Sequence, residues 1–239
     1  MSTFIVNRNG NAVNVKRVKR STVSESQISY CFPNGNKKYK NNDETGFIIW
    51  SIPPKTTCPF STAHCRAKCY AVKAWNAYPT VRVARTQNLR ATYSPTFVDD
   101  TVAIILYLAN TGKNKNRKRI IVRIHESGDF FSEWYLDKWL EICRRCQDAD
   151  ARIVFWAYTK SFEFLLNKEV PNNLFIRASV WDDTEQEQLD LIELLGLDIY
   201  TAVEKFSDND GFNHCRCEDC ATCETPCGEH NGHTACEIH

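Results

Sequence analysis

Three cysteines lie close together in the first half of the chain, within the segment CPFSTAHCRAKCY. They are Cys58, Cys65 and Cys69, and thiolates grouped in this way can hold three irons of a [4Fe–4S] cluster while the fourth iron stays open to another ligand. A structural zinc ion with His64 as its fourth ligand is the alternative. Because His64 and Cys65 are adjacent in the sequence, they are poorly placed to reach one tetrahedral ion, and the spacing favours the cluster.

A second group of cysteines lies near the C-terminus. The spacing C-x2-C-x2-C-x3-C, which bacterial ferredoxins use to bind clusters, is formed by Cys217, Cys220, Cys223 and Cys227. Cys215, Cys227 and Cys236 are alternative fourth ligands. Histidines in the same region leave zinc open as an alternative to iron. We therefore expect this tail to bind a metal, as an auxiliary iron–sulfur cluster or as zinc.

The other cysteines are expected to be structural. Cys143 and Cys146 form a further C-x2-C pair, but they share helical spacing with Tyr135, Trp139 and Ile142. Cysteines on the apolar side of a helix behave as small hydrophobic residues, so core packing is favoured over metal binding.

The amino-acid composition points to a reducing compartment. The chain has 12 cysteines among 239 residues, and its start lacks the apolar core and cleavage site of a secretory signal. We also find no apolar run of about 18 residues, so no membrane span is expected. In the cytoplasm thiols stay reduced, and clustered cysteines there favour metal or redox chemistry over disulfides.

Charge is distributed unevenly along the sequence. Residues 1–125 hold 21 Lys and Arg against 5 Asp and Glu, whereas residues 126–239 hold 9 against 24. Two readings remain open: the halves pack together with complementary charge, or the basic half presents a surface to nucleic acid or a phosphorylated ligand. The densest basic run covers residues 113–119, and a solvated loop is its alternative explanation.

Apolar runs that alternate with helical patterns indicate the fold. Runs rich in β-branched and aromatic residues predict strands at Gly46–Ile52, Ile120–His125, Ile153–Tyr158, Leu174–Ala178 and Ile199–Val203. Helical patterns cover Thr80–Tyr93, Thr96–Asn110, Ser132–Cys146 and Thr184–Leu195, with capping boxes expected from Thr96 to Asp99 and from Thr184 to Glu187. This alternation predicts an α/β fold with parallel strands, arranged as an open or partial (β/α) barrel.

The same patterns suggest three regions. Residues 1–45 form a basic N-terminal extension, residues 46–205 the partial barrel, and residues 206–239 a cysteine-rich tail. The tail is too short to build its own core, so we expect metal to order it.

Polar residues follow several of the predicted strands. The segment RIHESGDFF ends the second strand, and there Glu126 or Asp129 can accept a hydrogen bond from an amine while Gly128 admits a ligand close to the backbone. A plain turn in which Asp129 binds local amides is the alternative. Tyr158 and Lys160 follow the third strand and Arg177 lies on the fourth, so we expect a polar rim at the carboxyl edge of the sheet.

Four motifs and the cysteine tail resemble the phage gene product 88 family. The motifs are CPFSTAHCRAKCYA, YPTVRVARTQN, VRIHESGDFFSEWYLDKW and FWAYTKS. The resemblance covers most of Gly46–His239 and leaves the first 45 residues out. That family looks related to radical S-adenosylmethionine (SAM) enzymes, although this chain spaces its cysteines C-x6-C-x3-C instead of the usual C-x3-C-x2-C.

The resemblance implies a particular chemistry. A [4Fe–4S] cluster on the loop after the first strand would bind SAM through its open iron, with the tail holding an auxiliary cluster and with a flavodoxin or ferredoxin as electron donor. The residues expected to bind the cofactor are Ser127, Gly128, Asp129, Tyr158 and Arg177, and those expected to serve the reaction are Glu126, Asp129 and Lys160.

The sequence is therefore compatible with three functions. The first is a radical SAM-like enzyme of the host cytoplasm that acts on a nucleotide or nucleic acid. The second is a non-catalytic nucleic-acid-binding protein with structural iron–sulfur or zinc sites. The third is an electron-transfer protein, for which a 239-residue chain is large.

Overall fold

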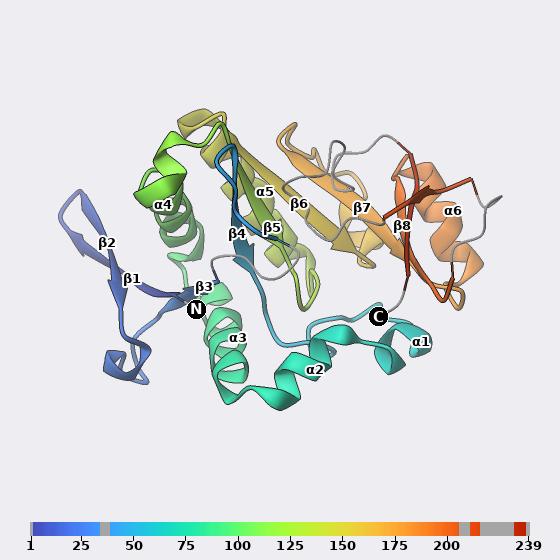
Figure 1. Cartoon of the computed structure of the whole chain (residues 1–239), viewed down its shortest axis with the longest axis horizontal. Coiled ribbons are helices and arrows are strands. Elements are labelled where there is room, and N and C mark those ends of the chain that lie inside the picture. The colour runs from blue at the N-terminus through green and yellow to red at the C-terminus, as the bar shows by residue number, and fades with distance from the viewer. Residues whose placement is uncertain (1, 34–38, 206–210, 216–231, 238–239) are drawn as a thin grey trace.

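A parallel sheet forms the centre of the molecule. The computed structural model describes residues 2–33, 39–205, 211–215 and 232–237. The sheet has seven strands, curled into a half-barrel (Figure 1), in the order β4 (Thr45–Trp50), β5 (Arg119–Ile124), β6 (Ile153–Thr159), β7 (Leu174–Val180), β8 (Ile199–Val203), β10 (Thr234–Glu237) and β9 (Asn213–His214). All of these neighbours pair in parallel. The predicted α/β class and parallel half-barrel are confirmed.

The helices connect the strands in chain order. They are α1 (Ala63–Ala67), α2 (Tyr70–Ala77), α3 (Pro79–Thr92), α4 (Phe97–Ala109), α5 (Glu133–Ala149) and α6 (Gln186–Leu194), with short 3-10 turns η1 (Arg20–Thr22), η2 (Gly112–Asn116) and η3 (Phe162–Leu165). Figure 1 shows α1, α2 and α3 following one another along one side of the molecule. The expected helices are present within a few residues of their predicted ends.

The two predicted capping boxes are wrong. The Thr96 hydroxyl donates to the Asp100 carboxylate at 2.8 Å and not to the helix backbone. The Thr184 hydroxyl instead accepts a hydrogen bond from the Trp181 amide at 2.9 Å, and α6 begins two residues later. Both hydroxyls therefore bond to partners other than the backbone amides of the helix that follows them.

The main core lies between one face of the sheet and the helices. On α5 the apolar stripe is fully or almost fully buried and consists of Tyr135, Leu136, Trp139, Leu140, Ile142, Cys143 and Cys146. Cys143 and Cys146 belong to this core cluster, as predicted. Their positions between sheet and helix keep them away from the sheet's carboxyl edge.

The first 45 residues contribute to the same core. β1 (Ser2–Asn9), β2 (Ala12–Val18) and β3 (Tyr30–Phe32) form a separate antiparallel sheet in the order β2-β1-β3. The rings of Phe4, Tyr30 and Phe32 are buried in the cluster that also contains Trp50 of β4. The expected boundary at residue 45 therefore marks a change of sheet and does not divide the core.

The described parts of the tail also join the main sheet. Residues Thr234–Glu237 of β10 pair with Tyr200–Val203 of β8, and β9 pairs with β10. The expected boundary at residue 206 therefore does not separate these two segments from the main sheet. Residues 216–231 lie outside the described residues.

Two residues of the basic run at residues 113–119 contact the segment that precedes β4. The Arg117 side chain donates from Nε to the Asn42 carbonyl at 2.6 Å, and Lys118 pairs with Glu44 at 2.9 Å. These contacts hold the segment before β4 against the start of β5. In the described residues, no helix has both the length and the apolar character needed to cross a membrane.

Candidate functional site

The three-thiol loop follows β4 at the carboxyl edge of the sheet. It contains Cys58, Cys65 on α1 and Cys69 at the start of α2, all as half-buried thiols outside any disulfide. Burial is the main cause that raises the pKa of Cys58 to about 12, and the charges of Asp129, Cys65 and Cys69 add to it. The three cysteines therefore share one loop at this edge, and their role as cluster ligands stays a prediction.

Lys160, which directly follows β6, supplies positive charge beside these thiols. Burial raises the pKa of Cys65, and the Lys160 ammonium opposes that shift. Burial in turn lowers the pKa of Lys160, while Cys65 and Asp129 act against it. The amine is buried and donates to the backbone carbonyl and hydroxyl of Ser179, both at 2.7 Å. This cation is thus fixed between β6 and β7, where it offsets part of the burial effect that raises the pKa of Cys65.

The segment Ser127–Asp129 fastens the three-thiol loop to the end of β5. The Ser127 hydroxyl donates to the Ile52 carbonyl at 2.9 Å, and the Ile52 amide donates back to the Ser127 carbonyl at 3.0 Å. The Asp129 amide donates to the Thr57 carbonyl at 3.1 Å. Three bonds therefore span the stretch of chain that leads directly to Cys58.

Gly128 has a specific reason to be glycine. Its φ is +88°, and a Cβ there would overlap Ile52 Cγ1 and lie 2.7 Å from Thr57 Oγ1. Side chains at positive φ are strained, and here no space for one exists. The sequence predicted that a ligand would come close to the backbone at Gly128. In the structure, Ile52 and Thr57 of the chain that leads to the cysteines occupy this space.

The Asp129 carboxylate accepts three hydrogen bonds. They come from the Thr159 hydroxyl at 2.6 Å, the Lys160 amide at 2.9 Å and the Phe130 amide at 2.7 Å. Burial raises the pKa of Asp129, and these bonds oppose the shift. The carboxylate joins the ends of β5 and β6, so its predicted role toward an amine ligand stays a prediction.

Glu126 lies at the same edge, near a buried arginine that sequence reasoning missed. The Tyr70 hydroxyl donates to the Glu126 carbonyl. Arg85 on α3 is buried, donates to the Ala71 carbonyl at 3.0 Å, and feels the charges of Glu126 and Cys69. The local sequence of α3 contains nothing that distinguishes this buried arginine from an exposed one. Its position adds a second cation beside the three-thiol loop.

Tyr158 and Arg177 lie side by side on the face of the sheet opposite α5. They are register partners in β6 and β7, and their neighbours Ala157 and Ile176 face the main core. The Arg123 guanidinium lies 4.0 Å from the centre of the Tyr158 ring. Arg177 donates to the Gly232 carbonyl at 2.8 Å. Tyr158 and Arg177, both predicted to bind the cofactor, therefore lie together on this face, which we call the inner face of the half-barrel.

His64 is directed toward the loop that follows β7. Its Nδ1 lies 2.6 Å from the Asp182 carboxylate, and its amide donates to Asp183 at 2.7 Å. Among the described residues, these three side chains are the group whose potential metal-ligand atoms all lie within 4.8 Å of one another, and the three thiols form no such group. These contacts connect α1 to the end of β7 and occupy the histidine proposed as a zinc ligand.

A family profile matches nearly the whole chain. The profile described as "Gene product 88" covers residues 24–237. The chain belongs to the Gene product 88 family. The match begins well upstream of Gly46, so it includes β3 and corrects the expectation that the first 45 residues lie outside the resemblance.

Two curated relatives carry the same gene description. The "Gene 88 protein" of Mycobacterium phage D29 is 30% identical over 106 residues, which are 44% of this chain and 42% of the relative. The "Gene 88 protein" of Mycobacterium phage L5 is 30% identical over 106 residues, or 44% and 43% of the two chains. The matched segment thus spans less than half of each relative. No solved structure matches this Gene product 88 chain.

Two tail cysteines of the Gene product 88 chain lie on neighbouring strands. Cys236 is in β10, and the Cys215 amide, directly after β9, donates to the Ala235 carbonyl at 2.7 Å. Because β9 and β10 are parallel and in register at His214 and Ala235, Cys215 and Cys236 follow at equivalent positions. Four predicted ligands, Cys217, Cys220, Cys223 and Cys227, lie outside the described residues.

His125 makes the stability of the fold dependent on pH. The Tyr135 hydroxyl accepts from Trp50 Nε1 at 3.0 Å and lies 3.0 Å from His125 Nε2, so its own proton is best donated to a neutral imidazole. Burial lowers the pKa of His125 well below its usual value, and the Arg123 charge adds to this. The unfolded chain binds a proton at this histidine below about pH 6.5, whereas the folded chain does not.

We therefore expect the free energy of unfolding to fall as the pH drops below about 6.5, by at most about 1.4 kcal/mol per pH unit. The His125→Asn variant tolerates the positive φ of this position and should lose less stability over the same range. Urea unfolding between pH 8 and pH 5 measures both slopes. Equal slopes for the two proteins would show that His125 does not cause the effect.

Proposed function

We propose that this Gene product 88 protein is a radical SAM-like iron–sulfur enzyme whose Cys58, Cys65 and Cys69 hold a [4Fe–4S] cluster. The observation that supports the proposal is the placement of three half-buried thiols outside any disulfide on the loop after β4, at the carboxyl edge of a parallel half-barrel where the buried Lys160 directly follows β6. In folds with parallel strands, chemistry gathers at this edge.

The donor set fits a cluster better than a single zinc ion. Thiolates are the usual ligands of [4Fe–4S] clusters. Two sulfur ligands of one tetrahedral zinc, each about 2.3 Å from the metal, lie roughly 3.8 Å apart. The three thiols do not all lie within 4.8 Å of one another, and a cube that places each ligand on a different iron accommodates this wider spread.

The chain's own residues would prepare the site. When bound, a cluster of this kind supplies the electron that cleaves SAM. The fixed ammonium of Lys160 offsets part of the burial effect that raises the pKa of Cys65, and the bonds from Ser127 and Asp129 hold the loop against β5. On the inner face, Tyr158 and Arg177 would lie beside the polar groups of SAM, with Arg177 held in place by the Gly232 carbonyl and by Asp198 at 3.7 Å. The required electrons would come from a flavodoxin or ferredoxin of the host cytoplasm.

Product analysis tests this proposal. The full chain, reconstituted with iron and sulfide without oxygen, is incubated with dithionite and SAM, and 5′-deoxyadenosine is measured by chromatography. We expect the product from the wild-type chain and at least a 100-fold loss in the Cys65→Ala variant, since that substitution removes a cluster ligand. A reducible cluster that leaves SAM intact would contradict the enzymatic proposal while leaving the cluster assignment standing.

A further inference from the structure

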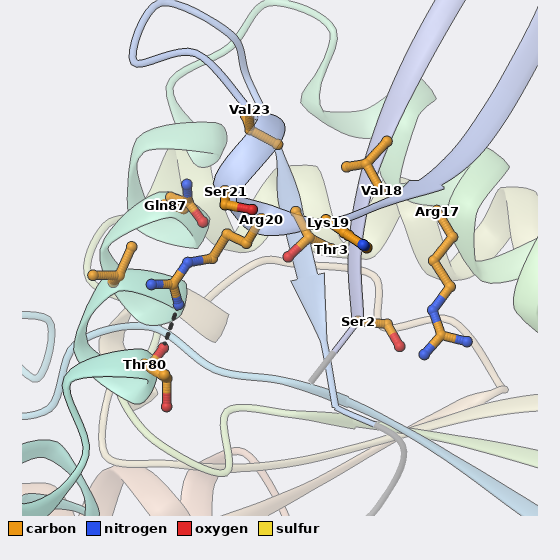
Figure 2. A pocket seen from close by; sticks show the side chains of 11 residues that line it. Ser2, Thr3, Arg17, Val18, Lys19, Arg20, Ser21, Val23, Thr80 and Gln87 are labelled. Carbon is orange, nitrogen blue, oxygen red and sulfur yellow. Dashed lines mark hydrogen bonds between the residues drawn. The ribbon is translucent and has the colours of Figure 1, made fainter.

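A large basic hollow lies between the N-terminal sheet and α3, away from the three-thiol loop. Its volume is about 980 Å³, at the upper end of the range for ligand pockets. Figure 2 shows its lining, with Arg20 extending toward Thr80 on α3 and with Arg17 on the opposite side of the view. The hollow is therefore built from the start of β1, the end of β2, the turn η1 and the part of α3 between Thr80 and Gln87.

The lining is positively charged. Its cations are Arg17, Lys19 and Arg20, its hydroxyl groups include those of Ser2 and Thr3, and no carboxylate lines it. A concave surface lined by one sign of charge concentrates ligands of the opposite sign. The hollow thus favours an anionic ligand.

These cations are not neutralised within the described part of the chain. Residues 2–33 contain five Lys and Arg and a single acid, Glu25. Arg8 is paired with Asp100, but no described carboxylate forms an ion pair with Arg17 or Lys19. Arg20 donates to the Thr80 carbonyl at 2.9 Å, a bond that orients its guanidinium without cancelling its charge.

We propose that this hollow binds the phosphodiester backbone of a nucleic acid. Arginine, lysine and hydroxyl side chains are the groups that contact phosphate oxygens in such complexes, and spacing several cations along one strand and turn suits a chain of phosphates. The β1–β2 hairpin projects from the molecule (Figure 1), and Arg17 and Lys19 at its end are exposed, so a long polymer can reach them.

The hollow shares a helix with the three-thiol site. Thr80, Val83 and Gln87 of α3 line the hollow, whereas Arg85 points to Ala71, two residues after Cys69. A nucleic acid held in the hollow would therefore lie one helix away from the proposed cluster. Binding at this surface is independent of the cluster, so failure of one proposal leaves the other open.

Fluorescence anisotropy tests this inference with a labelled single-stranded DNA of about 20 nucleotides. In the variant R17Q/K19Q/R20Q, we expect the affinity at low salt to fall at least tenfold. The slope of log affinity against log salt should decrease in magnitude by about two, because each lost phosphate contact contributes roughly 0.7 for a single strand. The variant R17Q/K19Q keeps the Arg20–Thr80 bond and should show an intermediate loss.

The matched control is K113Q/K115Q/K118Q, which removes the same charge from the basic run at residues 113–119. It should bind within about twofold of the wild-type chain. An equal loss in the control would show that net charge and not the hollow governs binding. Absence of binding by the wild-type chain, or equal competition by poly-glutamate, would also overturn the proposal. Single-stranded RNA and duplex DNA of the same length identify the preferred nucleic acid.

Discussion

Replacing Cys65 by alanine is expected to lower the iron content of the reconstituted chain by about four atoms, together with about four sulfides. Cys65 lies on α1 between the other two cysteines of the loop and next to the charge of Lys160. A [4Fe–4S] cluster that keeps only two of three protein thiolates loses its anchorage. Iron and acid-labile sulfide, measured after removal of unbound metal, give the result directly.

The control for this prediction is Cys143→Ala. Cys143 is also a reduced thiol, but it lies on α5 and is fully buried in the core. Its replacement should cost about 1–2 kcal/mol of folding free energy and leave the iron content unchanged. If Cys65→Ala retained all of its iron, or if both variants lost the same amount, the loop would not be the site of the cluster.

The second large effect is expected from Gly128→Ala. Alanine at φ +88° is strained, and its methyl group would overlap Ile52 and approach Thr57. Left-handed strain of about 1–2 kcal/mol and overpacking of about 1–3 kcal/mol together predict a loss of roughly 2–5 kcal/mol in the free energy of unfolding. Because Ile52 and Thr57 lead to Cys58, the substitution should also reduce cluster incorporation. Urea unfolding and iron analysis measure the two effects.

Gly10→Ala separates strain from overlap. Gly10 has φ +58° in the turn between β1 and β2, and a Cβ there meets no atom within 4 Å. This control should lose only about 1 kcal/mol and incorporate iron normally. A Gly128→Ala variant as stable as Gly10→Ala would show that the contact between Ser127–Asp129 and the three-thiol loop is not tight.

Much of the fold follows from the apolar runs. Runs such as Ile120–Ile124 are buried on both sides and must lie inside a layered sheet, so their strands and parallel pairing could be predicted. The placement of the three cysteines at the sheet's carboxyl edge follows from the strand that precedes them. These features depend on residues that are neighbours in the sequence.

The remaining features depend on distant partners. β1 and β2 have mixed burial without strict alternation, and β10 is a four-residue strand that is paired on both sides. The carboxylate of Asp129 receives bonds from β6, thirty residues away, and Arg85 turns toward the loop through packing of α3. Local sequence patterns do not specify such distant pairings, so they left open whether Asp129 binds a ligand or local amides and did not indicate the position of Arg85.

The most direct test of the central claim is the metal content of a chain whose six C-terminal cysteines are replaced by serine. The substituted residues are Cys215, Cys217, Cys220, Cys223, Cys227 and Cys236. After anaerobic reconstitution, the account predicts about four irons per chain and the electron paramagnetic resonance signal of a reduced [4Fe–4S] cluster, held by Cys58, Cys65 and Cys69. A chain that binds no iron, or one zinc ion in its place, would contradict it.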